Sequence, residues 1–139
     1  MEQSFLCGYS GLWMVRLSFA AMVAVLFLQS GLDKLFNWKG EKEWLTGHFA
    51  KSFLKGMVPI MLPVITVLEL AAGSCAAAGI FQLLLNGGNT IGTWGMVLGT
   101  KAIALLFFGQ RVAKDYAGAA SLVPYFLMCA AGMWAFMVA

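Results

Sequence analysis

The stretch from Val58 to Leu85 reads VPIMLPVITVLELAAGSCAAAGIFQLLL, and its only charged residue is Glu69. A helix of about 20 mostly apolar residues is long enough to cross the roughly 30 Å hydrocarbon core of a bilayer. The stretch exceeds that length, so we expect a membrane-spanning helix with room for tilt.

Three further apolar stretches have the length of a membrane span. They cover residues 12–32, 91–108 and 116–138. None of the four stretches shows the alternation of apolar and polar residues that is typical of a membrane β-barrel. The sequence therefore predicts an all-α polytopic membrane protein, with residues 1–139 forming one domain built as a four-transmembrane-helix bundle.

The composition agrees with a chain whose main partners are membrane lipids. Hydrophobic residues make up 61% of the chain and charged residues 11%, and the mean hydropathy is +0.84. Soluble domains carry about a quarter charged residues. The net charge of +3 comes from residues between the apolar stretches, so we do not expect nucleic acid as a partner.

The positions of the basic residues predict an orientation. Seven of them lie in the segments between the first and second spans and between the third and fourth spans: Lys34, Lys39, Lys42, Lys51, Lys55, Arg111 and Lys114. On the opposite side, Arg16 is the only basic residue. Because Lys and Arg accumulate in cytoplasmic loops, we expect both termini on the outer, periplasmic side.

The segment between the first two spans has an amphipathic pattern over residues 38–57. Leu45, Phe49 and Phe53 recur every four residues, which places them on one face of a helix. Tryptophans and lysines accompany them. We expect a helix lying in the membrane interface, acting as an anchored connector or as a docking surface for a partner protein.

Small residues within the spans predict where the helices approach one another. Gly73 and Ala77 form a small-xxx-small pair in the second span, and Gly95 and Gly99 form one in the third. Helices in a bilayer associate through such close contacts. We expect these faces to close within one bundle, with contact to a second subunit as the alternative.

Two charges fall near the middle of neighbouring spans. Glu69 is about 16 Å along the second span, and Lys101 reaches a similar depth from the other end of the third. Charges at that depth are costly unless they are paired. We expect a Glu69–Lys101 ion pair that fixes helix register, with a proton or quinone site as the functional alternative. A protonated Glu69, or Arg16 as its partner, is a further alternative, although Arg16 is near enough to the outer end of its span to reach the interface.

The chemistry-bearing residues do not form a recognisable metal, haem or iron–sulfur site. Cys7, Cys75 and Cys129 are scattered, and His48 is the only histidine. Haem ligation and iron–sulfur clusters need more ligands than these, and structural zinc needs four. The sequence predicts no bound metal or cofactor, and it does not predict catalysis by this chain on its own.

Three short motifs in the first 80 residues together resemble the DoxX-like family of small four-helix membrane proteins. Arg16 opens an apolar run that ends in Gly31-x-x-Lys34-Leu35, and Glu69 is followed by Leu-Ala-Ala-Gly. The resemblance implies a bacterial inner-membrane protein near electron-transfer or thiol chemistry, with quinone as a candidate ligand. It also implies that Arg16, Lys34 and Glu69 are polar positions that matter.

Three functions remain open from the sequence. The first is an accessory or structural subunit of a membrane redox complex or of another multi-protein complex, in contact with other integral membrane subunits. The second is a quinone-interacting oxidoreductase subunit that uses Glu69 and Lys101. The third is a small proton-coupled transporter built around Glu69.

Overall fold

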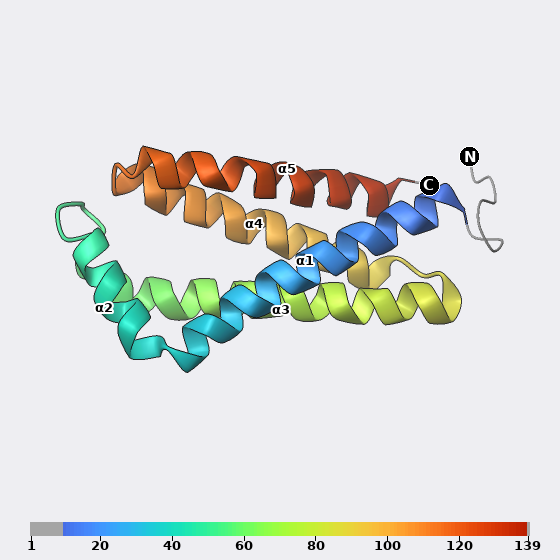
Figure 1. Ribbon diagram of the computed structural model, residues 1–139, viewed down its shortest axis with the longest axis horizontal. Coiled ribbons are helices and arrows are strands. Elements are labelled where there is room, and N and C mark those ends of the chain that lie inside the picture. Colours follow the sequence, from blue (N-terminus) through green and yellow to red (C-terminus); the bar gives the residue numbers. More distant parts are fainter. Residues whose placement is uncertain (1–9, 139) are drawn as a thin grey trace.

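The computed structural model describes residues 10–138, and all of their regular structure is helical. Five helices follow one another: α1 (Gly11–Phe36), α2 (Trp38–His48), α3 (Val58–Asn86), α4 (Thr90–Val112) and α5 (Tyr116–Met137). All except α2 are long and apolar enough to cross a membrane. The predicted four-helix membrane bundle is therefore confirmed (Figure 1).

The four spanning helices lie side by side along the long axis of the molecule, and α3 is the central element. It packs against both α1 and α4, and α5 packs against α4. The start of α1 and the end of α5 lie at one end of the bundle, which we call the terminal end (Figure 1). The α1–α3 connection and the α4–α5 turn lie at the opposite end, which we call the α2 end.

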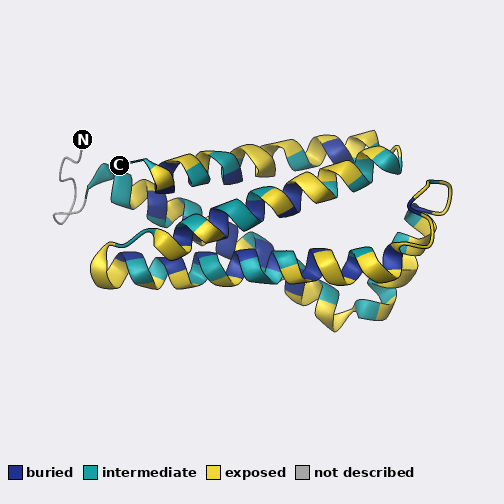
Figure 2. Ribbon diagram, turned by 180° about the vertical axis from the view of Figure 1, so that it is seen from behind, coloured by how far each residue is buried: buried dark blue, intermediate teal, exposed yellow. Residues whose placement is uncertain are grey.

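The burial pattern is that of a bundle surrounded by apolar solvent. Buried residues form a stripe along the inner side of each spanning helix, while the outer sides are exposed (Figure 2). Many of the exposed side chains are large and apolar, such as Val25, Val67 and Trp134, each more than 60% exposed. Hydrocarbon around the bundle accounts for such an outer surface.

Small residues allow the helix backbones to approach closely inside the bundle. A Cβ on Gly79 would lie 2.6 Å from the Cα of Gly92, and a Cβ on Gly95 would lie 2.7 Å from the backbone nitrogen of Ala76. These contacts join α3 to α4. Gly73 lies against Leu28 of α1, so the glycine faces close within one chain at these positions.

Gly99, the other small residue predicted in the third span, faces a different neighbour. A Cβ on it would lie 2.8 Å from the Phe27 ring of α1 and 3.3 Å from the Cys129 sulfur of α5. Ala77 is half-buried and packs against the same core. The contacts of Gly99 with Phe27 and Cys129 therefore bring α1, α4 and α5 together at the centre of the bundle.

The connection between the first two spans differs from the prediction. The helix α2 ends at His48, and residues 49–57 form turns. The Ser52 hydroxyl bonds the Phe49 carbonyl and the Leu54 amide, which competes with helical bonding, and Gly56 has a φ of 83°. Phe53 is consequently 75% exposed, whereas Phe49 is buried. The expectation that Leu45, Phe49 and Phe53 share one helix face was wrong.

Candidate functional site

A buried ion pair joins α1 to α3. The Lys34 Nζ lies 3.0 Å from Glu69 Oε2 and donates a weaker hydrogen bond to Oε1 at 3.4 Å. Glu69 is 1% exposed. The same ammonium donates to the Ser30 hydroxyl at 2.9 Å, so it is held by one turn of α1 and by the middle of α3.

The geometry leaves one oxygen of this carboxylate without a well-aligned hydrogen bond. Oε2 is close to the ammonium, but it has no hydrogen-bond donor among the described residues. Buried polar oxygens usually have such a donor. Glu69 therefore has the capacity to accept one more hydrogen bond, from water or from a ligand.

The predicted ion pair between Glu69 and Lys101 was wrong. Lys101 is exposed, and no carboxylate of the described residues lies within ion-pair distance of it. The depth prediction does agree with the helix contacts. Because Gly95 lies against Ala76 in the antiparallel pair, six residues further along α4 bring Lys101 level with Leu70. Lys101 is at the level of Glu69 but points to a different side.

At the terminal end, Arg16 connects the start of α1 to the end of α5. It is 7% exposed, and its guanidinium donates to the carbonyls of Ala135 at 2.8 Å and Val138 at 2.6 Å. It therefore satisfies the last carbonyls of α5. The alternative pairing of Arg16 with Glu69 is not seen among the described residues, where Glu69 pairs with Lys34.

Gly31 explains the close approach of α1 and α3 at the ion pair. A Cβ on Gly31 would lie 2.6 Å from Leu70 Cδ2 and 3.4 Å from the Leu70 backbone nitrogen. A larger residue at this position would meet the Leu70 side chain, three residues along α1 from Lys34. The structure thus brings Gly31, Lys34 and Glu69 together, whereas Arg16 lies at the other end of the bundle.

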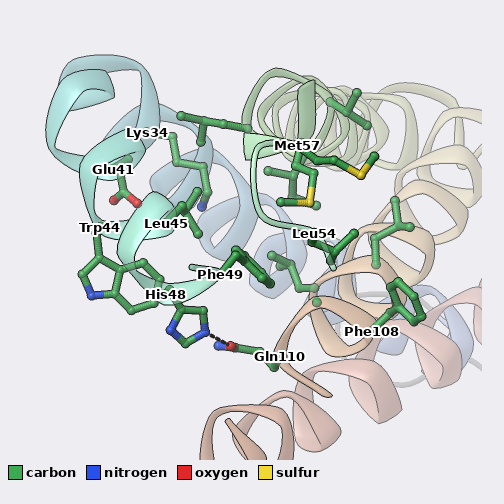
Figure 3. A pocket seen from close by; sticks show the side chains of 17 residues that line it. Lys34, Glu41, Trp44, Leu45, His48, Phe49, Leu54, Met57, Phe108 and Gln110 are labelled. Atoms are coloured by element: carbon green, nitrogen blue, oxygen red, sulfur yellow. Dashed lines mark hydrogen bonds between the residues drawn. The ribbon is translucent and has the colours of Figure 1, made fainter. Parts of the chain in front are cut away.

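A cavity of about 380 Å³ opens at the α2 end, between α2, α3 and α4. Its walls are almost entirely apolar, and include Leu45, Leu62, Ile65 and Leu106. Lys34 also lines it, so one member of the buried ion pair faces the cavity (Figure 3). Natural small-molecule sites have a similar size and the same mixture of apolar walls with a few polar groups.

Polar and aromatic groups gather on one side of this cavity. The His48 Nε2 lies 2.7 Å from the Gln110 side-chain oxygen (Figure 3) and 3.8 Å from the Asp115 carboxylate. The His48 ring stacks on Trp44 with their centroids 4.5 Å apart. Next to them, Phe49 packs with Leu54 and Val58.

Sequence reasoning missed His48 and Gln110 as a unit. They are 62 residues apart, and only the docking of α2 against the end of α4 brings them together. The one available signal was the His48 position on the apolar side of the amphipathic segment, four residues after Trp44.

The site can bind an amphiphile of aromatic or lipidic character and hydrogen-bond its polar part. The described residues contain no group of three His, Cys, Asp or Glu side chains that would hold a metal ion. Cys75 and Cys129 are both free thiols, and Cys7 lies outside the described residues. Comparisons with models of protein families, with curated proteins and with solved structures found no match for this chain.

Proposed function

We propose that this chain is a DoxX-like accessory subunit of a membrane redox complex, and that it binds a quinone in the cavity at the α2 end. The observation that carries the proposal is the position of Lys34, which lines the apolar cavity while its ammonium contacts the buried carboxylate of Glu69. A quinone has an apolar tail and a ring with polar carbonyl groups, so its site needs both an apolar cavity and a polar group such as the Lys34 ammonium.

The cavity offers the contacts that a quinone ring would use. The Trp44 and His48 rings supply flat aromatic faces, and Gln110 supplies an amide within reach of a carbonyl oxygen. Lys34 is a hydrogen-bond donor for a second carbonyl. The apolar walls of α3 and α4 suit an isoprenoid tail.

The family-motif residues support the same interpretation. Gly31 and Lys34 belong to one of the DoxX-like motifs and Glu69 to another; Lys34 pairs with Glu69, and Gly31 lies against the neighbouring Leu70. Redox association and the DoxX-like relationship are part of the proposal. We also propose that the α2 end faces the cytoplasm, since seven Lys and Arg side chains belong to its two connections and their flanks.

A transporter built around Glu69 has less support. A proton-coupled carboxylate must exchange its proton with substrate or water, and here Lys34 holds it at 3.0 Å. The ion pair favours a fixed carboxylate that orients Lys34.

The experiment is a measurement of quinone in the purified protein. The full chain is extracted in mild detergent, and its bound quinone is quantified by chromatography with absorption detection. The pocket-filling variant Met61→Trp is compared with Val67→Trp, which places the same side chain on the exposed face of α3, outside the cavity. We expect stoichiometric quinone in the parent and in Val67→Trp, and loss of most of it in Met61→Trp. Equal quinone in all three proteins would mean partition into the detergent and would overturn the proposed site.

A further inference from the structure

Two opposite charges face outward from spanning helices and have no partner in the described part of the chain. Asp33 is exposed near the end of α1, and Lys101 is exposed at the twelfth of the 23 residues of α4. Neither takes part in any of the ion pairs formed by residues 10–138. Charges on the outer side of a membrane bundle are costly there, and pairing is the usual remedy.

The two charges lie at nearly the same level of the bundle. Gly31 lies against Leu70, and Asp33 is two residues further along α1, a rise of about 3 Å. Lys101 is level with Leu70 through the contact of Gly95 with Ala76. Copies of one chain that share an orientation in a membrane therefore present Asp33 and Lys101 at matching depth.

This level is inside the apolar slab rather than at its boundary. Exposed apolar side chains continue beyond it toward the α2 end, including Ile60 and Val64 on α3 and Leu105 and Phe108 on α4. Ile60 is nine residues from Glu69, which corresponds to about 14 Å along the helix. Headgroup water is therefore not the natural environment of Asp33 and Lys101.

The two charges point away from different sides of the molecule. Successive residues are rotated by about 100° around a helix. Asp33 is two residues from Gly31, which faces α3, so it points from α1 away from α3. Lys101 is six residues from Gly95, which also faces α3, so it points outward from α4. A two-fold axis would bring the same face of both copies together, so it would leave one charge of each copy unpaired. The α1 face of one copy must instead meet the α4 face of the next, which is a head-to-tail contact between copies of the same orientation in the membrane.

We infer that copies of this chain associate head to tail in the membrane, with Asp33 on α1 of one copy paired with Lys101 on α4 of the next. The occupant of each face is a second copy, because the same chain supplies a complementary charge at the matching depth. Exposed apolar residues on the same side of each helix complete the two faces, such as Met22, about three turns from Asp33 on α1, and Trp94, about two turns from Lys101 on α4. The inference does not depend on the proposed quinone site, which lies between α2, α3 and α4 of a single copy.

Cross-linking in native membranes tests the contact. In the full chain with Cys7, Cys75 and Cys129 replaced by alanine, Phe36→Cys combined with Leu105→Cys is treated with a short bifunctional maleimide. These exposed positions lie about one turn from Asp33 and from Lys101, and the variant keeps both charges. We expect a ladder of linked copies. The matched control combines Leu105→Cys with Val15→Cys, which is exposed on α1 about six turns from Phe36, and it should give no ladder. A ladder from the control alone, linkage to a different protein, or no linkage would overturn the inference.

Charge reversal separates a specific pair from mere proximity. Asp33→Lys and Lys101→Asp should each reduce the oligomer, measured by light scattering in mild detergent, by about tenfold in association constant. The double variant D33K/K101D should restore it. If a reversed charge prevents membrane insertion, the neutral variants Asp33→Asn and Lys101→Gln should each weaken the oligomer as well. An oligomer that is insensitive to all these changes, or a parent protein that is monomeric, would contradict the pairing. Quinone content of the same samples shows separately whether the cavity is intact.

Discussion

The ammonium of Lys34, in the last turn of α1, lies 3.0 Å from the carboxylate of Glu69, near the middle of α3. The two side chains are 15% and 1% exposed. The contact joins the end of one span to the interior of another at the point where Gly31 allows the helices to touch. It therefore fixes the register of α1 on α3 and directs a lysine toward the cavity.

Breaking this pair from one side should destabilise the protein strongly. Lys34→Met leaves Glu69 buried without a counter-charge, and loss of one partner of a buried pair costs about 3–5 kcal/mol. Removing both charges in K34M/E69M should recover most of that loss, because apolar side chains suit the same space. Unfolding in mixed detergent micelles, followed by circular dichroism, measures the free energies.

Lys39→Met is the matched control, since Lys39 is an exposed lysine of α2. It should change the free energy of unfolding by less than about 0.5 kcal/mol. If K34M/E69M proves as unstable as the sum of its two single variants, the pair is not coupled and the register argument fails.

The spanning helices were predictable because each is a long apolar run, and hydrocarbon imposes length and composition directly on the sequence. The prediction placed the second span at residues 58–85, and α3 runs from Val58 to Asn86. The first span extends four residues beyond its predicted end at Leu32, to Phe36. The added turn is the one that contains Asp33 and Lys34, which hydropathy assigns to a loop.

The partner of Glu69 was not predictable, because depth along a helix is simpler to infer than direction around it. Lys101 is at the expected level, but a rotation of about 120° from the α3-facing Gly95 takes it out of the bundle. Direction depends on which glycines meet which neighbours. Lys34 became the partner because its long side chain extends from the end of α1 to the interior of α3.

The contact between Gly79 and Gly92 should tolerate no added methyl group. A Cβ on Gly79 would lie 2.6 Å from the Gly92 Cα, which is backbone and has no freedom to rotate away. Gly79→Ala should therefore separate α3 from α4 and cost about 1–3 kcal/mol. The same unfolding measurement checks this.

Gly47→Ala is the control for that variant. Nothing lies within 4 Å of a Cβ at Gly47, and alanine favours a helix more than glycine does. Gly47→Ala should leave stability unchanged or raise it. A Gly79→Ala protein as stable as the parent would show that the α3–α4 contact is looser than the structure indicates.

The hydrogen bond between His48 and Gln110 should hold α2 against the end of α4. His48→Phe keeps a ring to stack on Trp44 but loses the 2.7 Å bond. Because a hydrogen bond contributes about 1 kcal/mol net, amide hydrogen exchange in α2 should accelerate about fivefold. Mass spectrometry of peptides covering residues 38–48 measures the rate.

Thr46→Ala is the control, since the Thr46 hydroxyl is exposed and bonds only the Lys42 carbonyl within α2. Its exchange rates should match those of the parent protein. Equal exchange in His48→Phe and in the parent would assign the docking of α2 to the apolar cluster around Phe49 instead.

The two ends of the bundle should be reached by reagents from opposite sides of the membrane. In the background without native cysteines, Lys55→Cys reports the α2 end, and Asn86→Cys reports the terminal end; both positions are exposed. Basic residues favour the cytoplasmic side, and seven belong to the connections at the α2 end and their flanks, whereas the Asn86 connection has none. A membrane-impermeant maleimide added to intact cells should label Asn86→Cys only, and labelling of Lys55→Cys should appear after permeabilisation. The reverse pattern would place the proposed quinone cavity at the outer side of the membrane and would invert the orientation inferred from the basic residues.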